Sequence, residues 1–158
     1  MDGVPIDEID RIILHLLQED ARRNTNAEIS RQVSVSASTV GKRIARLEKE
    51  GILKGYRPEI DYERAGFPLQ VLFVCTAPIA AREALATETL GVEGVLNVRE
   101  LMTGEKNVHI QAVGASNEDI TRIAHKLDEI GYSVADEILL RNEYSQPSVQ
   151  FRPTTDGK

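Results

Sequence analysis

Residues 26–50 contain two short amphipathic segments separated by a three-residue break. The second segment, residues 37–49, has apolar side chains at i, i+4 and i+7, which places them on one face of a helix. Ser36 is suited to cap the start of this helix and Gly51 to end it. Two short helices joined by a tight turn predict a helix-turn-helix that can enter a DNA major groove.

The rest of the predicted second helix is polar or basic. The side chains that lie off its apolar stripe, and that suit phosphates and base edges, are Ser38, Thr39, Lys42, Arg43, Arg46 and Lys49. Residues 42–57 hold six basic residues against two acidic ones, in a chain whose formal net charge is -6. Such a concentrated positive segment favours phosphate contact. Helical spacing alone also allows a protein-interaction module with a solvated charged face.

Two more helices complete a predicted DNA-binding domain over residues 1–57. Apolar residues at helical spacing indicate a helix from Asp7 to Glu19. Thr25 with Glu28 is typical of a capping box at the start of the shorter helix. Residues 52–56 have the pattern of a short strand, and residues 58–68, punctuated by proline and glycine, are expected to be a linker.

Beyond the linker the chain alternates between strand-like and helical segments. The expected strands are residues 69–76, 95–102, 108–113 and 133–143, and the expected helices are residues 80–90 and 116–130. This βαββαβ order predicts an α+β, ferredoxin-like domain over residues 69–144, with both helices on one face of a four-stranded antiparallel sheet. The other face needs a partner, so we expect a homodimer. The tail, residues 145–158, is expected to be mobile or to pack on a neighbouring subunit.

Composition narrows the class of protein. Residues 1–60 hold ten basic and ten acidic residues, so the whole charge deficit lies in the second part of the chain. No signal peptide and no membrane-spanning run is evident, which predicts a cytoplasmic protein without a membrane partner. The single cysteine, Cys75, is expected to be buried in a strand. The three histidines lack metal-ligand spacing, so neither a metal nor another cofactor is expected.

In their order and spacing these segments resemble the Lrp/AsnC family of transcriptional regulators, also called feast/famine regulatory proteins. The resemblance runs to about Glu143 and is carried by residues 6–13, 26–29, 36–48 and 51–56. It implies a helix-turn-helix domain linked to an effector domain, in dimers, tetramers or octamers that bind pseudo-palindromic promoter sites. By position, the residues that match the DNA-contacting part of the family's recognition helix are Ser36, Ser38, Thr39, Lys42 and Arg43, with Arg46 on phosphate.

The resemblance also places an effector loop between the second and third strands. Its residues are Thr103, Gly104, Glu105, Lys106 and Asn107. The family usually has an Asp at the last position, whose carboxylate can pair with the ammonium group of an amino-acid ligand. The neutral amide of Asn107 lacks that charge-assisted hydrogen bond. We therefore expect a contribution from Glu105, a different small-molecule effector, or none, and Gly104 is equally explained as a hairpin glycine.

Two other functions stay open. Sirohaem decarboxylases resemble this family in domain layout, and His109 could attend a tetrapyrrole. An architectural protein could coat DNA with little sequence preference, since backbone contacts alone supply tight, salt-sensitive binding. The basic helix-turn-helix surface favours a regulator over an enzyme, and the acidic second half argues against indiscriminate coating. The expected function is thus that of a non-enzymatic, sequence-specific transcriptional regulator.

Overall fold

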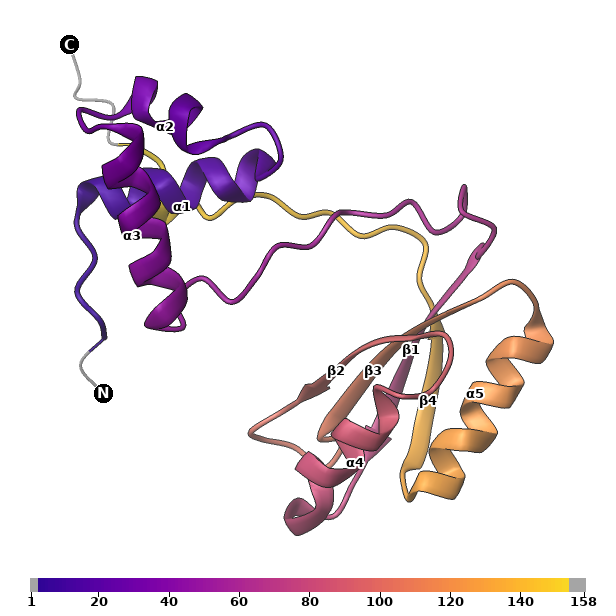
Figure 1. The fold of residues 1–158 in the computed structure, drawn as a ribbon. Coiled ribbons are helices and arrows are strands. Elements are labelled where there is room, and N and C mark those ends of the chain that lie inside the picture. The colour runs from indigo at the N-terminus through magenta and orange to yellow at the C-terminus, as the bar shows by residue number, and fades with distance from the viewer. Residues whose placement is uncertain (1–2, 154–158) are drawn as a thin grey trace. The chain divides into compact units, whose positions relative to one another are not determined.

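The computed structural model describes residues 3–153, which form two compact units (Figure 1). The helical unit combines the residues up to Pro58 with those from Tyr144 onward, and the sheet unit spans Glu59–Glu143. The linker residues 59–68 therefore group with the sheet unit, and the described part of the tail groups with the helical unit.

Three helices share one core in the helical unit: α1 (Glu8–Asp20), α2 (Asn26–Gln32) and α3 (Ala37–Lys49). Their buried apolar residues include Ile13, Ile29, Val40 and Leu47, each with no exposed surface. The predicted caps of α3 are confirmed. The Ser36 hydroxyl accepts the Thr39 N–H at 3.1 Å, and Gly51, at φ +69°, ends the helix.

Three local predictions in this unit needed correction. First, α1 begins at Glu8 because Asp7 is its N-cap, bonded reciprocally with Asp10. Second, residues 52–56 form no strand, because the N–H groups of residues 52 and 53 both bond Leu47 O and close α3. Third, the Thr25 hydroxyl does cap α2, but the Glu28 carboxylate pairs with Arg31 at 2.5 Å.

The sheet unit has the predicted βαββαβ order. Its strands are β1 (Leu69–Thr76), β2 (Val95–Glu100), β3 (Val108–Gly114) and β4 (Ser133–Leu139), and its helices are α4 (Arg82–Thr89) and α5 (Asn117–Ile130). A short 3-10 helix, η1 (Ile79–Ala81), precedes α4. All strand pairs are antiparallel, in the order β2-β3-β1-β4. The core between sheet and helices is built from Phe73, Ile110, Ile123 and Leu127, among others.

One face of the sheet is not covered by α4 and α5. Because side chains alternate along a strand, residues next to the core positions Phe73 and Ile110 point to this open face. The strand register aligns one row across it, made of Asn97, Gln111, Leu72 and Ile138. Cys75 points the other way, into the core, as the sequence predicted, and burial raises the pKa of its thiol to about 11.

Two glycines with similar backbone angles should respond very differently to alanine. Gly94 has φ +95°, and a Cβ there would lie 2.7 Å from Val113 O and 2.8 Å from Ile123 Cδ1. Gly104 has φ +96°, but its Cβ would meet no atom within 4 Å. We expect Gly94→Ala to lower the free energy of unfolding by about 3 kcal/mol, from overpacking plus backbone strain, and Gly104→Ala by about 1 kcal/mol, from strain alone. Urea unfolding measures both, and equal losses would contradict the steric argument.

Within residues 3–153, no helix has the length and apolar character that crossing a membrane requires. The same described residues contain no group of three or more His, Cys, Asp or Glu side chains arranged to hold a metal ion.

Candidate nucleic-acid interface

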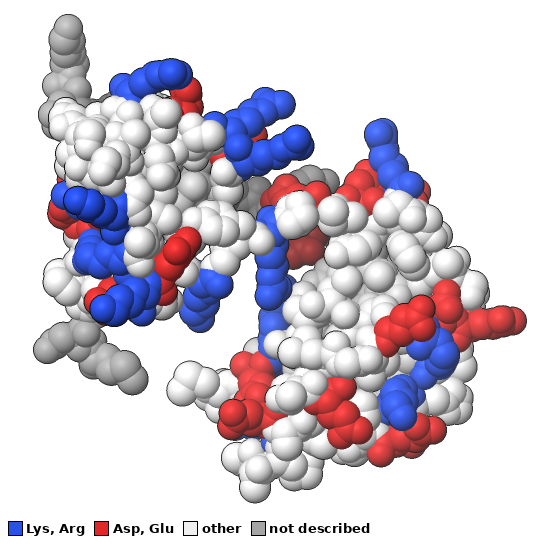
Figure 2. Space-filling model, in the orientation of Figure 1, with Lys and Arg blue, Asp and Glu red and all other residues white. Residues whose placement is uncertain are grey.

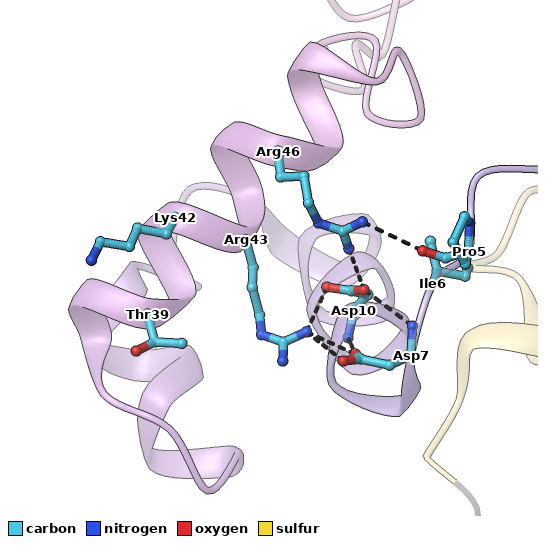
Figure 3. Close-up of a pocket in the computed structure, with 8 residues that line it drawn as sticks. All are labelled: Pro5, Ile6, Asp7, Asp10, Thr39, Lys42, Arg43 and Arg46. Atoms are coloured by element: carbon cyan, nitrogen blue, oxygen red, sulfur yellow. Dashed lines mark hydrogen bonds and ion pairs between the residues drawn. The ribbon is translucent and has the colours of Figure 1, made fainter.

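The outer surface of α3 carries the side chains that the sequence assigned to DNA. Ser36, Ser38 and Lys42 are exposed, and Thr39 is half-buried. Lys42 points away from the acidic groups nearby (Figure 3). Ser36 is already engaged as the helix cap, and its hydroxyl also lies 3.0 Å from that of Thr39. The start of α3 thus presents hydroxyl groups and one extended cation.

Arg43 and Arg46 are held differently, by two carboxylates at the start of α1. Arg43 Nη1 lies 2.7 and 2.8 Å from the two Asp7 oxygens and 3.0 Å from Asp10 Oδ1. Arg46 Nη2 bonds Asp10 Oδ2, and its Nη1 lies 3.4 Å from the carbonyl oxygen of Pro5. We call Asp7, Asp10, Arg43 and Arg46 the carboxylate clasp (Figure 3).

The clasp lies in a hollow of about 550 Å³ between α3 and the chain before α1. The hollow is lined by Pro5, Ile6, Asp7, Asp10, Thr39, Lys42, Arg43 and Arg46. Four of the predicted DNA-contacting residues therefore come together here, whereas Ser36 and Ser38 are not among the lining residues.

Asp10 is the buried centre of the clasp. Its side chain is 2% exposed, against 54% for Asp7, 25% for Arg43 and 38% for Arg46. A buried carboxylate needs charged or hydrogen-bonding partners. Asp10 has both arginines and the backbone N–H of Asp7. The clasp thus fixes α3 against α1 and offsets two positive charges of α3 with two negative charges.

The sequence prediction missed the carboxylates of this site. The sequence predicts that Asp7 starts a helix and that Asp10 lies within it, but it does not predict that either side chain reaches α3. A local signal existed in the pattern Asp-x-x-Asp before an apolar run, but it specifies a cap. The contact with Arg43 spans 33 to 36 residues of sequence, which helical periodicity does not report.

The pKa of Asp7 should give the clasp a measurable acid sensitivity. The Asp10 backbone N–H, followed by the Arg43 guanidinium, holds the pKa of Asp7 below its usual range, and both carboxylates raise the pKa of Arg43. A lowered folded-state pKa contributes stability above the ordinary carboxyl pKa, and this contribution is lost as the pH falls through the folded value.

Asp7→Asn should therefore melt below the wild type at neutral pH, and the gap should shrink below about pH 4. Melting temperatures from about pH 6 to about pH 2 test this expectation, with the exposed Asp128→Asn as control. A gap that stays constant across that range would show that the Asp7 charge is not involved.

The loop matched to an effector site lies between β2 and β3 in the sheet unit. Thr103 and Gly104 are exposed. Lys106 Nζ lies 2.7 Å from Asp136 Oδ2, and Glu105 O accepts the Thr76 hydroxyl at 3.0 Å. The loop is thereby fastened to β4 and to the end of β1.

Asn107 has a structural role in this loop. Its side chain is buried, with Oδ1 accepting the Ala77 N–H and Nδ2 donating to the Ala77 carbonyl, both at 2.9 Å. An amide can both accept from the N–H and donate to the carbonyl of one residue, whereas an ionised carboxylate can only accept. The amide of Asn107 is thus committed to Ala77 and does not face a ligand.

Charge is divided between the units. The sheet unit holds fifteen Asp and Glu against seven Lys and Arg over residues 59–143. In Figure 2, blue side chains project from the helical unit and red clusters mark the sheet unit on the face shown. A helix-turn-helix with hydroxyls and a cation on its second helix, joined to a βαββαβ unit, defines a two-domain helix-turn-helix DNA-binding protein.

Comparison with known proteins gives the family. The AsnC-type helix-turn-helix domain matches residues 6–48. A helix-turn-helix transcriptional regulator of Pyrococcus horikoshii is 34% identical over 128 residues, which is 80% of each chain. The chain belongs to the Lrp/AsnC family of transcriptional regulators, which confirms the resemblance found in the sequence.

Solved structures show the same fold. A Neisseria meningitidis transcriptional regulator in complex with L-Met is 25% identical, covers 91% of this chain and 95% of its own, and has a TM-score of 0.75. The leucine response regulatory protein of Mycobacterium tuberculosis is 22% identical, covers 90% of this chain and 97% of its own, and has a TM-score of 0.78. Both share the α+β architecture of a helix-turn-helix followed by a ferredoxin-like domain.

Proposed function

We propose that the protein regulates transcription in the cytoplasm by placing α3 in the major groove of a specific promoter site. The distribution of side chains along α3 supports this proposal. Ser38, Thr39 and Lys42 lie at the exposed start of the helix, which is the part that reaches base edges in helix-turn-helix proteins. The clasp residues hold that helix on α1.

The two clasp arginines have a second role in this proposal. Part of each guanidinium side chain remains exposed, 25% for Arg43 and 38% for Arg46. A guanidinium held on one side by a carboxylate still offers donors in the plane of its fork. Arg43 and Arg46 would then contact phosphates while Asp10 fixes their direction, and Ser36 would contribute through its capping position.

Lys42→Ala tests this arrangement. We expect weaker binding to the protein's own upstream DNA, because an extended cation facing the groove is removed. A phosphate role would reduce the salt slope by about one and weaken binding to all sequences alike, whereas a base role would cost roughly 1 to 3 kcal/mol at one position. Mobility-shift titrations at two salt concentrations separate the two roles.

The matched control is Lys126→Ala, which removes an exposed lysine from the sheet unit. Unchanged affinity and salt slope for Lys42→Ala would remove Lys42 from the site. Wild-type binding that is equal on unrelated DNA and is erased by salt would instead indicate an architectural role.

Assembly and effector response are part of the proposal. We propose a homodimer through the open face of the sheet, where the row ends in Ile138, which is 45% exposed. The L-Met complex of the Neisseria regulator supports a small-molecule effector of the amino-acid class at the loop of residues 103–107. Since Asn107 is committed to Ala77, Glu105 is the carboxylate that would face an ammonium group. His109, the residue that could attend a tetrapyrrole, lies on β3, paired with Val74 and Arg99, and we propose a regulator and not an enzyme.

A further inference from the structure

The described part of the C-terminal tail is docked on α1. Phe151 packs against the core of the helical unit, and the Ser148 N–H donates to Gln18 Oε1 at 3.2 Å. Between them runs a short 3-10 helix, η2 (Val149–Phe151), whose first turn is capped by the Ser148 hydroxyl. The sequence suggested a mobile tail or one packed on a neighbouring subunit, but this apolar anchor holds it on its own chain.

The same segment is anchored at its other end in the sheet unit. Just after β4, the Leu140 N–H donates to Gln70 O at 2.7 Å. Glu143 Oε2 lies 3.3 Å from Gln111 Nε2, and Gln111 Oε1 accepts from Asn97 Nδ2 at 2.8 Å. Gln111 belongs to the row on the open face of the sheet, so the segment begins at the surface proposed to meet a second copy.

The connection between the two anchors is short. Only residues 144–147 separate Glu143 from Ser148, and five extended residue steps span at most about 18 Å. The other connection between the two cores, from Leu53 to Leu69, has fifteen intervening residues. The tail therefore leaves far less slack between its two anchors than the linker leaves between the two cores.

We propose that residues 140–151 act as a strap that couples the open sheet face to the position of the DNA-binding helices. A second observation points to the input. Asn97 Oδ1 is buried and has no hydrogen-bond partner among residues 3–153. Since this oxygen is covered but unpaired, a second copy that packs on this face is expected to reorder the Asn97–Gln111–Glu143 row so that Asn97 Oδ1 gains a donor, and this rearrangement moves the strap. The effect on DNA binding rests on the proposed function. The strap is docked on α1, and the clasp joins α1 to α3.

The first test measures the docking of the strap on the helical unit, in the absence of DNA. The chain has no tryptophan, so Phe151→Trp introduces a single indole at the docking point. We expect blue-shifted emission that moves to the red when the exposed residue Glu143 is replaced by alanine. The control Glu137→Ala, on β4, should leave the emission unchanged. Emission typical of a fully exposed indole in the parent, or no response to Glu143→Ala, overturns the strap.

The second test lengthens the strap. An insertion of about six Gly and Ser residues between Tyr144 and Ser145 keeps both anchors and adds slack. We expect about tenfold weaker binding to a site with two half-sites and unchanged binding to one half-site, because only the mutual orientation of the two DNA-binding domains is lost. The same insertion after Pro153 is the control.

The two proposals fail in different ways. If the lengthened protein binds the full site as tightly as the wild type, the strap is overturned and the regulator stands. If the wild type shows no preference for any DNA, the proposed function fails. The strap is then decided by the indole response to Glu143→Ala.

Discussion

Replacing Asp10 with alanine is expected to lower the free energy of unfolding by about 3 kcal/mol and to abolish specific DNA binding. The substitution leaves the Arg43 and Arg46 guanidinium groups without their shared buried partner and the Asp7 N–H without its acceptor. Breaking a buried pair on one side costs about 3 to 5 kcal/mol. The lower end applies because both guanidinium groups retain some contact with water.

Further substitutions at the two carboxylates separate the effect of the Asp10 charge from the effect of its side-chain size. Asp10→Asn keeps the size of the side chain and its acceptor for the Asp7 N–H, so we expect a smaller loss. Asp7→Ala removes a half-exposed carboxylate and an N-cap, which together should cost about 1 to 2 kcal/mol. Urea unfolding and mobility shifts on the same preparations give both quantities. A loss from Asp7→Ala equal to that from Asp10→Ala would mean that burial of Asp10 is not the source of the effect.

The second large effect is expected at Asn107. Asn107→Ala leaves the Ala77 N–H and carbonyl unpaired at a position that is 3% exposed. Each unsatisfied buried group costs about 1 to 3 kcal/mol, so the two groups together are expected to cost about 2 to 6 kcal/mol. Lys106→Ala, which breaks an exposed ion pair with Asp136 in the same loop, should cost less than about 1 kcal/mol and serves as the control.

Asn107→Asp introduces the carboxylate that the family resemblance led us to expect at this position. The new carboxylate could still accept the Ala77 N–H, but it would face the Ala77 carbonyl oxygen, which favours the protonated form. A carboxyl whose folded-state pKa is raised stabilises the fold below its ordinary pKa and loses that contribution as the pH rises. We therefore expect Asn107→Asp to be less stable than the wild type at neutral pH and to recover in acid. Full stability at neutral pH together with gained amino-acid binding would show that position 107 faces a ligand.

Local features were predictable from the sequence. Ser116 and Asp119 cap α5, and Gly131 at φ +124° ends it, because all three signals act within one turn of the helix. The failed strand at residues 52–56 shows the limit of that reasoning. An apolar pair that resembles a strand is used instead to close α3 and fill the core.

The hydrogen-bonding partners of the site residues could not be predicted, because they are distant in the sequence. The sequence placed Arg43 and Arg46 on the correct helix, but their carboxylates lie on another helix and leave no periodic signal. Asn107 likewise bonds Ala77 across 30 residues. The tail was uninformative because a single aromatic residue, Phe151, makes its apolar anchor.

Chemical labelling of the buried Cys75 thiol can report local opening of the sheet unit. Thiol reagents attack the thiolate, and a residue without exposed surface whose pKa is about 11 offers almost none at neutral pH. Labelling must therefore wait until β1 separates from its neighbours. Because Cys75 is the sole cysteine of the chain, the labelling rate follows one event in one place. Comparing that rate with and without DNA measures whether occupancy of α3 changes the opening of the sheet unit.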